Sequence, residues 1–369
     1  MKRIAIITYS RAYNYGSALQ TYALNHYLTM LGYDVKTIDY TTHSQQQLYT
    51  IFEPCKGFMS VVRNIQSLWH YNNLKSHKKQ FDDFLLLHVP MTLPVLSSED
   101  LALLNLQFDY FISGSDQIWN VQCDDFDINY MLSFVHDKQK CIAYAPSLGG
   151  GAKNVQTKET LREYVKSYKA LSSRERESTQ IIADATSRTV ENVLDPVFLL
   201  DAVQWKNISK QSPIEGEYIL GYFIGDVPGM RDFAAQLSRE SNCPVVVILK
   251  SVRDIKYGFK AYYEAGPLEF ISLIHGCKCV VTNSFHAVSF SLIFEKTFWA
   301  FVPPKSDDGR IKSILDLVQL PDRIVDVDDV LDIDKFSPID YDLINRENLN
   351  TMIKSSQDYL KYNIDYGTM

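Results

Sequence analysis

The chain has 369 residues, which is enough for two domains with sizeable buried cores. Hydrophobic residues make up 46% and charged residues 22%, with 16 Gly and 13 Pro, so extensive disorder and fibrous repeats are excluded. The formal charge is −7 and no apolar stretch is long enough for a membrane span, so neither nucleic-acid binding nor membrane insertion is expected.

The N-terminal residues predict a strand, a turn, a helix and a second strand. Residues 3–9 read as a buried strand, Asn14 to Ser17 as the turn and 18–31 as a helix that ends at Gly32, followed by a strand over 33–40. This β-α-β unit predicts a parallel sheet, with ligands beyond the carboxyl ends of its strands.

The rest of the first half predicts a helical insertion at about 45–94 that covers one side of the sheet. Beyond it, each predicted strand is followed by small or turn residues that let a ligand approach the backbone. The strands expected there are 108–112, 140–145 and 170–173, and the helices are 157–169 and about 176–185.

The second half restarts the alternation after a junction at 201–216. Its expected strands are 218–223, 244–249 and 279–282, and its expected helices are 228–241, 267–275 and 287–294. Two such runs predict an α/β protein with two Rossmann-like domains facing each other across a cleft. The predicted domains are 1–200 and 201–340, with a C-terminal helix in 341–369, at about 341–362, that packs back on the first.

Cysteines and histidines show no metal or redox pattern. Cys277 and Cys279 are interpreted as packing residues at the start of a strand, because C-x-x-C spacing is absent. His70, His77 and His88 lack the spacing of a paired metal motif. No metal site and no cofactor are expected.

The turn at Asn14, Gly16 and Ser17 opens a helix. Free N–H groups and the positive end of the helix dipole stabilise an anion there. A tight turn with Asn14 or Ser17 as a helix cap explains the same residues, so both interpretations remain open.

Two other strand ends carry residues suited to chemistry. Arg174 follows a short strand, where a guanidinium can bind a carboxylate or phosphate; a solvated helix start is the alternative. His286 lies in the turn before a helix and suits general acid or base work, although packing and capping are the commoner roles of such a histidine.

Polar and cationic side chains next to these strand ends complete the candidate set. Asp116, which follows Ser115, and Asp195 each have three interpretations: a proton acceptor, a ligand for a sugar hydroxyl, or a helix cap. Lys305 and Arg310 supply cations for an anionic ligand from a predicted turn. The chain has many aromatic residues, with 23 Tyr, 19 Phe and 4 Trp. Most of them are expected to fill the core, and some of them to stack on sugar rings.

Taken in order, these segments resemble the polysaccharide pyruvyl transferase family. The matching stretches, which fall between about residues 5 and 315, are Ala12 to Gln20, Ser113 to Asn120, Tyr144 to Gly149, Ser173 to Ser178, Leu194 to Leu199, Gly266 to Phe270 and Thr282 to Ala287. The resemblance implies a GT-B-like fold and transfer of a pyruvyl group from phosphoenolpyruvate to a sugar of a surface glycan. It also implies that His286 is the proton donor and Arg174 the anion-binding arginine.

The sequence departs from the family pattern at two places. Ser284 stands where family members typically carry arginine, and Ser17 stands where they usually carry an acidic residue. The missing arginine removes a charge-assisted contact worth about 1.5–3 kcal/mol. Either Lys305 or Arg310 compensates for it, or the donor differs and the fold serves another glycan modification.

We therefore predict a cytoplasmic, ketal-forming enzyme of exopolysaccharide biosynthesis. Its expected partners are phosphoenolpyruvate and an acceptor, which is a glycan or a lipid-linked oligosaccharide. A lipid-linked acceptor would place the protein at the inner face of the membrane by peripheral association. The expected substrate-binding residues are Asn14, Gly16, Ser17, Ser115, Asp116, Ser284, Lys305 and Arg310. Two alternatives remain: a glycosyltransferase that uses a nucleotide sugar, and a glycan-binding protein without catalytic activity.

Overall fold

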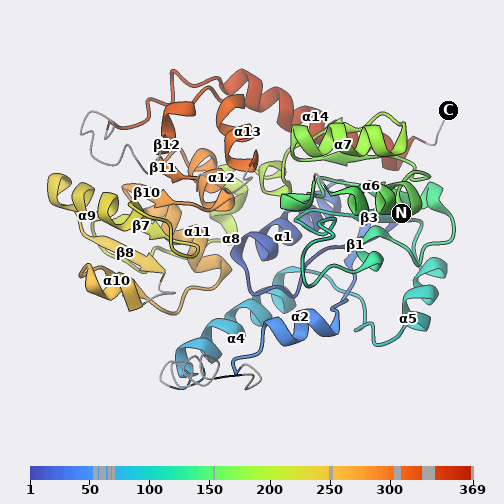
Figure 1. Cartoon of the computed structure of the whole chain (residues 1–369), viewed down its shortest axis with the longest axis horizontal. Helices are drawn as coiled ribbons and strands as arrows, with labels where there is room; N and C mark the ends of the chain where they lie inside the picture. Colours follow the sequence, from blue (N-terminus) through green and yellow to red (C-terminus); the bar gives the residue numbers. More distant parts are fainter. Residues whose placement is uncertain are drawn as a thin grey trace. The chain divides into compact units, whose positions relative to one another are not determined.

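The computed structural model divides the chain into two compact units (Figure 1). The first comprises Met1–Leu199 and Met352–Met369, and the second Leu200–Thr351. The described residues are 1–52, 57, 64, 68, 71–152, 154–248, 252–302, 309–325 and 337–366. Each unit is a parallel sheet flanked by helices, so the predicted α/β class is confirmed. No helix among these described residues is long and apolar enough to cross a membrane.

The sheet of the first unit has the order β2-β1-β3-β4, with every neighbouring pair parallel. Residues 4–7 of its central strand are completely buried, as expected for a strand covered on both faces. Its strands are β1 (Arg3–Ile7), β2 (Asp34–Thr37), β3 (Tyr110–Ser113) and β4 (Cys141–Ala143). A two-stranded parallel ladder, β5 (Ser172–Ser173) with β6 (Glu191–Asn192), follows them in the chain.

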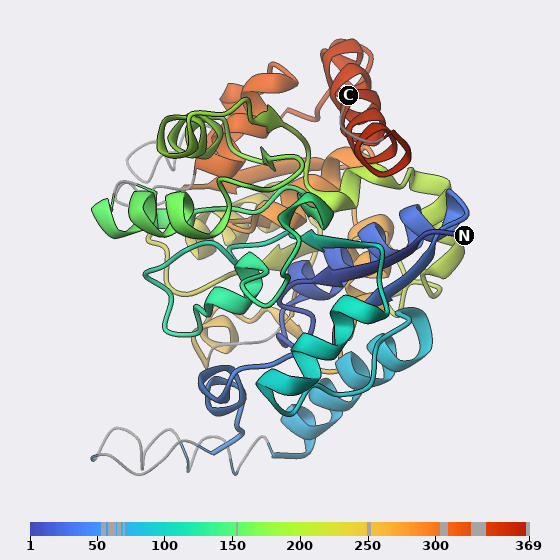
Figure 2. The same cartoon turned by 90° about the vertical axis from the view of Figure 1, so that its right-hand side faces the viewer.

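The helices of the first unit include α1 and α4, which pack on each other (Figure 2). The Phe81 ring lies 5.1 Å from that of Tyr15, and the Phe84 ring lies 5.9 Å from that of Tyr22. The described part of the predicted insertion therefore contacts α1; residues 53–56, 58–63, 65–67, 69 and 70 lie outside the described residues. The helices are α1 (Tyr15–Met30), α2 (His43–Leu48), α4 (Tyr71–His88), α5 (Ser98–Leu103), α6 (Val155–Tyr164) and α7 (Arg176–Thr186).

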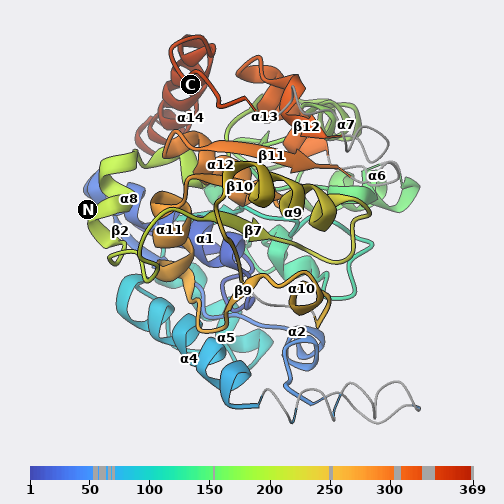
Figure 3. The same cartoon turned by 90° about the vertical axis from the view of Figure 1, so that its left-hand side faces the viewer.

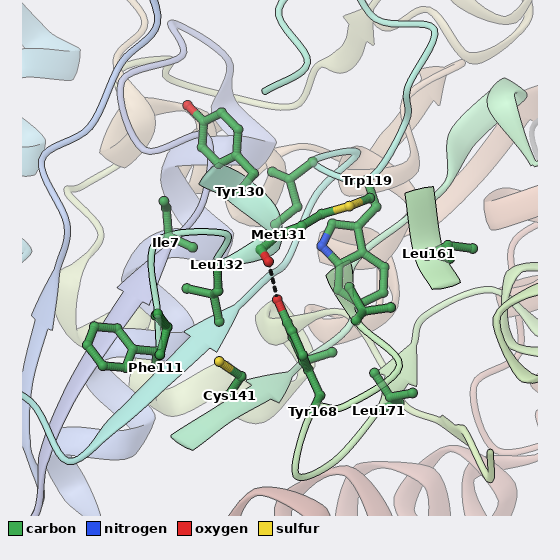
Figure 4. Packing of buried hydrophobic residues seen from close by; sticks show 14 of the residues in the cluster. Ile7, Phe111, Trp119, Tyr130, Met131, Leu132, Cys141, Leu161, Tyr168 and Leu171 are labelled. Atoms are coloured by element: carbon green, nitrogen blue, oxygen red, sulfur yellow. Dashed lines mark hydrogen bonds between the residues drawn. The ribbon is translucent and has the colours of Figure 1, made fainter. Parts of the chain in front are cut away.

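The sequence predicts that the helix over 157–169 ends at residue 169, but α6 ends at Tyr164. The core of the first unit explains this difference. Val165 and Tyr168 are completely buried. Figure 4 shows the Tyr168 side chain among the core residues. The Tyr168 hydroxyl donates a hydrogen bond of 2.6 Å to the carbonyl of Met131. Burial of these two side chains outweighs continuation of the helix.

The sheet of the second unit has the order β12-β11-β10-β7-β8-β9 and is parallel throughout. The sequence predicts β7, β8 and β10 but not the other three, of which β9 and β12 are short edge strands that have one neighbour each. Its strands are β7 (Ile219–Tyr222), β8 (Val245–Ile248), β9 (Lys260–Tyr262), β10 (Cys279–Thr282), β11 (Thr297–Phe301) and β12 (Ile324–Val325).

Helices cover both faces of this second sheet (Figure 3). On one face the Phe233 ring of α9 lies 5.6 Å from Trp299 and 5.4 Å from Phe301. On the other, the Phe270 ring of α11 lies 5.1 Å from Tyr222. The helices are α8 (Ala202–Ile208), α9 (Met230–Ser241), α10 (Val252–Lys256), α11 (Pro267–Gly276), α12 (Phe285–Ile293) and α13 (Gly309–Leu317).

The last helix, α14 (Arg346–Asp365), starts later than the predicted residue 341. The hydroxyl of Tyr341 donates to the carbonyl of Lys296 at 2.8 Å, and the amide of Ile339 donates to Thr297 Oγ1 at 3.0 Å. These contacts hold the preceding segment against β11 in a non-helical conformation.

Candidate active site

Asn14 caps the helix that follows β1. Its Oδ1 accepts hydrogen bonds from the amides of Gly16 at 2.9 Å and Ser17 at 3.4 Å. These are the N–H groups that would otherwise be free to bind an anion. The capping interpretation of the turn therefore describes what the structure contains, and the Ser17 hydroxyl points away from the backbone toward Asp116.

The loop after β3 places Ser115 and Asp116 at the carboxyl end of the sheet. Gly114 has φ +138°, and a Cβ there would lie 1.9 Å from the carbonyl oxygen of Tyr144, so glycine is required. Asp116, with φ +76°, accepts a short hydrogen bond from the Ser17 hydroxyl on Oδ2 and one of 2.8 Å from the Gln117 amide on Oδ1. The Asp116 carboxylate is thus held by the Ser17 side chain on one oxygen and by the Gln117 backbone amide on the other.

Arg174 lies beside β5, where it is buried and surrounded by carboxylates. Its Nη1 is 2.5 Å from Asp195 Oδ2, its Nε is 3.1 Å from Glu175 Oε1, and its Nη2 is 3.6 Å from Asp116 Oδ1. The Ser115 hydroxyl lies 3.4 Å from both Arg174 Nη1 and Asp195 Oδ2. We call Arg174, Asp116, Glu175 and Asp195 the Arg174 cluster.

The Arg174 cluster has one guanidinium against three carboxylates, a formal charge of −2. Burial opposes the charged form of Arg174, but the neighbouring carboxylates, Asp195 first among them, raise the pKa of the guanidinium further above its ordinary value. The cluster as a whole repels a phosphate and offers carboxylate oxygens to hydroxyl donors.

The Cys123 thiol and the Tyr49 hydroxyl lie near enough to Asp116 to be affected by its charge. Burial, and then the carboxylates of Asp125 and Asp116, raise the pKa of the Cys123 thiol to about 11. Burial and the same two carboxylates raise the pKa of Tyr49 to about 12. These side chains are therefore neutral at physiological pH and present hydroxyl and aromatic surface next to a carboxylate.

In the second unit, the loop between β10 and α12 is held at both ends. Asn283 Oδ1 accepts from the amide of Ile224 at 2.8 Å, and its Nδ2 donates to the carbonyl of the same residue at 2.7 Å. Ser284 is the N-cap of α12 and accepts from the amide of Ala287 at 3.4 Å. Asn283 and Ser284 are therefore the polar residues that the sequence shows between the strand and the helix, and Ser284 acts as the helix cap.

His286 is the second residue of α12 and is 8% exposed. Its ring lies 5.1 Å from that of Phe285 in an edge-to-face arrangement. The guanidinium of Arg310, on α13, lies 6.0 Å from the Phe285 ring. The structure therefore brings a histidine, an arginine and the N-terminus of a helix together on Phe285.

The predicted site residues fall into these two groups. Asn14, Gly16, Ser17, Ser115, Asp116 and Arg174 lie in the first unit, and Ser284, His286 and Arg310 in the second. Lys305 lies outside the described residues.

Two members of the Arg174 cluster were not among the predicted site residues. The sequence indicates a proton acceptor, a ligand for a sugar hydroxyl or a helix cap at Asp195 but does not place it among the expected substrate-binding residues, and it indicates no role for Glu175, which follows Arg174 directly. Both lie next to the ends of short strands, which is the signal that could have grouped them. No group of His, Cys, Asp or Glu within the described parts of the chain has the arrangement of a metal site.

The sequence matches one protein-family model, and the structure is similar to solved structures that share one fold. The family model described as polysaccharide pyruvyl transferase matches residues 14–304. No curated protein matches the chain.

Among solved structures, UDP-GlcNAc 2-epimerase from Methanocaldococcus jannaschii aligns over 100% of both chains with TM-score 0.54 at 12% identity. The S. aureus MnaA–UDP structure covers 99% of this chain and 97% of that one, with TM-score 0.55 at 10% identity. The Neisseria meningitidis UDP-GlcNAc 2-epimerase bound to UDP-GlcNAc covers 99% of both, with TM-score 0.53 at 10% identity. The chain thus has the GT-B-like α/β fold that the sequence resemblance implies.

Proposed function

Because this chain belongs to the polysaccharide pyruvyl transferase family, we propose that it transfers the pyruvyl group of phosphoenolpyruvate to a glycan sugar as a cyclic ketal. The observation that supports this most is His286, retained within the matched residues 14–304 and fixed in the first turn of α12. A histidine suits general acid and base work near neutral pH.

The donor is proposed to bind to the second unit. Phosphoenolpyruvate carries a phosphate and a carboxylate, so its binding requires positive charge. Arg310 and the positive end of α12 supply it around Phe285, where Ser284 replaces the family's arginine. We propose Arg310 as the cation that compensates for this replacement.

The proposed reaction balances as follows. His286 donates a proton to C3 of the enol, which creates positive charge at C2, and a sugar hydroxyl attacks C2. The C2–O bond to phosphate then breaks, and a second hydroxyl of the sugar closes the ketal. Two C–O bonds form and one breaks. One hydroxyl proton is accounted for by the new methyl group, and the other leaves with phosphate.

The acceptor sugar is proposed to bind at Asp116. One carboxylate oxygen of this half-buried residue accepts from the Ser17 hydroxyl, and its other oxygen faces the Arg174 guanidinium at 3.6 Å. A carboxylate in this position can hold a sugar hydroxyl by accepting its hydrogen bond. Arg174 is then a positioning residue for Asp116 and not the ligand of the donor phosphate, because three carboxylates already offset its charge.

A second candidate donor is a nucleotide sugar. The fold is similar to that of proteins whose structures were determined with UDP and with UDP-GlcNAc, which favours this alternative. A third candidate is a glycan-binding protein on the same fold that has lost catalytic activity. The wider setting, exopolysaccharide synthesis in the cytoplasm with a lipid-linked acceptor at the membrane, remains part of the proposal.

Calorimetric titration of the full chain with phosphoenolpyruvate and, separately, with UDP-glucose distinguishes these candidates. We expect saturable binding of phosphoenolpyruvate, weakened about tenfold in Arg310→Met because a charge-assisted contact is lost. The matched control is Lys312→Met, an exposed cation on the same helix α13. Binding of UDP-glucose alone would favour the nucleotide-sugar candidate, and binding of neither would favour the glycan-binding one.

A further inference from the structure

A groove of about 490 Å³ lies in the first unit, separate from the Arg174 cluster. Its volume falls in the range of about 300–1,000 Å³ that is typical of ligand sites. The lining comes from residues 169–171, from the segment that leads into β6, and from one face of α14. Asp358 and Tyr362 are four residues apart and so share that face.

The two cations of the groove are already engaged. The Arg188 guanidinium donates to the carbonyls of Lys166 at 3.0 Å, Lys169 at 3.1 Å and Tyr168. The ammonium of Lys169 donates to the carbonyl of Tyr366 at 3.1 Å and lies 4.8 Å above the Tyr110 ring. Neither cation is therefore available to bind an anion without losing these contacts.

The two carboxylates of the groove are not engaged. The side chains of Glu191 and Asp358 are exposed and make no hydrogen bond or ion pair with any residue that the structure describes. Since Lys169 and Arg188 balance their charge, the groove is formally neutral but offers acceptor oxygens. This chemistry suits an uncharged ligand that is rich in hydroxyl donors and disfavours an anion.

Aromatic and amide groups stand next to these carboxylates. The Tyr362 side chain is 53% exposed on α14. Asn363 lines the same groove, where its Nδ2 donates to the carbonyl of Tyr359 at 2.9 Å. An exposed flat ring can pack against the apolar face of a sugar ring, while carboxylates and amide oxygens accept from its hydroxyls.

We propose that this groove, formed by Glu191, Asp358, Tyr362 and Asn363, is a second carbohydrate-binding site that takes a neutral sugar and carries out no chemistry. It goes beyond the proposed function, because binding here does not depend on His286 or on phosphoenolpyruvate. A site of this kind would hold a distant sugar of a glycan chain and raise its effective concentration at the protein.

The test is ligand-observed NMR on the full chain with methyl β-D-galactopyranoside, methyl β-D-glucopyranoside and lactose as probes. At least one probe should bind saturably. Tyr362→Ala should weaken this binding about three- to tenfold through loss of the stacking contact, and Asp358→Asn should also weaken it. Tyr71→Ala, which removes a 37% exposed tyrosine of α4 outside the groove, should leave it unchanged.

Spermidine and inorganic phosphate are the competing probes. Absence of saturable sugar binding, equal binding to the Tyr362→Ala variant, or preference for spermidine or phosphate would overturn the proposal. His286→Gln should retain groove binding. If His286→Gln loses turnover but still binds the sugar, binding in the groove does not depend on the active site. The proposed function and this site can therefore fail separately.

Discussion

Asp116 is the residue at which the contacts of the first unit converge. It accepts a hydrogen bond from the Ser17 hydroxyl and faces Arg174, and its charge also raises the pKa of the Cys123 thiol. A single side chain thus links the turn after β1, the loop after β3 and the end of β5.

The thiol of Cys123 reports on this arrangement. Because its pKa is raised to about 11, little thiolate exists at pH 8, and alkylation by iodoacetamide should be slow, rising about tenfold per pH unit up to pH 11. Asp116→Asn should lower the pKa of the thiol and accelerate alkylation at pH 8. Asp83→Asn, which changes an exposed carboxylate of α4, is the control; an equal rate in both variants would show that Asp116 does not act on Cys123.

Arg174 should be essential for stability of the first unit. Arg174→Met removes the only guanidinium of the Arg174 cluster and leaves its three carboxylates without a cation. Because two of these carboxylates are almost completely buried, the change should lower the unfolding free energy by about 3–5 kcal/mol. Arg176→Met, on the exposed first turn of α7, should change stability by less than about 0.5 kcal/mol. Chemical denaturation of both variants measures the difference, and similar midpoints would contradict the buried ion-pair account.

At the scale of elements, periodicity predicts the long helices and the buried central strands. Turns with Asn14 and Ser284 are predicted as helix starts because capping residues have a local sequence signature. β9 and β12 are not predicted, since strands of 3 and 2 residues are defined by their neighbours in the sheet. The order of the strands likewise brings Asp116, Arg174 and Asp195 together. A local sequence pattern does not predict this order, so their proximity could not be predicted.

Ser284 should stabilise α12 as its N-cap. Ser284→Ala removes the N-cap of the helix and should lower the unfolding free energy by about 1 kcal/mol, whereas Ser284→Asn should retain it. Thermal denaturation compares the two. If Ser284→Ala is as stable as the wild type, the 3.4 Å cap contact contributes nothing to the helix.

At the scale of the whole molecule, α14 begins in the second unit and completes the first. In the first unit Ser356 Oγ accepts from the amide of Leu194 at 2.9 Å, and the Tyr359 hydroxyl donates to the carbonyl of Ala143 at 2.8 Å. The end of β4 and the residue before Asp195 are therefore tied to α14.

The double variant Ser356→Ala/Tyr359→Phe should lose about 2 kcal/mol, since two buried hydrogen bonds are removed. Amide hydrogen exchange should then increase first at Ala143 and Leu194, while β7 and β10 keep their protection. Uniform loss of protection over both sheets would contradict the division into two units.

The central claim is the transfer of pyruvate from phosphoenolpyruvate, and its most direct measurement is phosphate release by the full chain. The acceptors are a panel of methyl hexopyranosides and lipid-linked oligosaccharides, and the mass of each product is recorded. We predict phosphate release that depends on one acceptor, whose mass rises by one pyruvic acid less one water.

His286→Gln should reduce this release by about 10²–10⁴-fold, as expected for loss of a general acid, while the exposed His136→Gln should not change it. Phosphate release by His286→Gln at the wild-type rate would contradict the account.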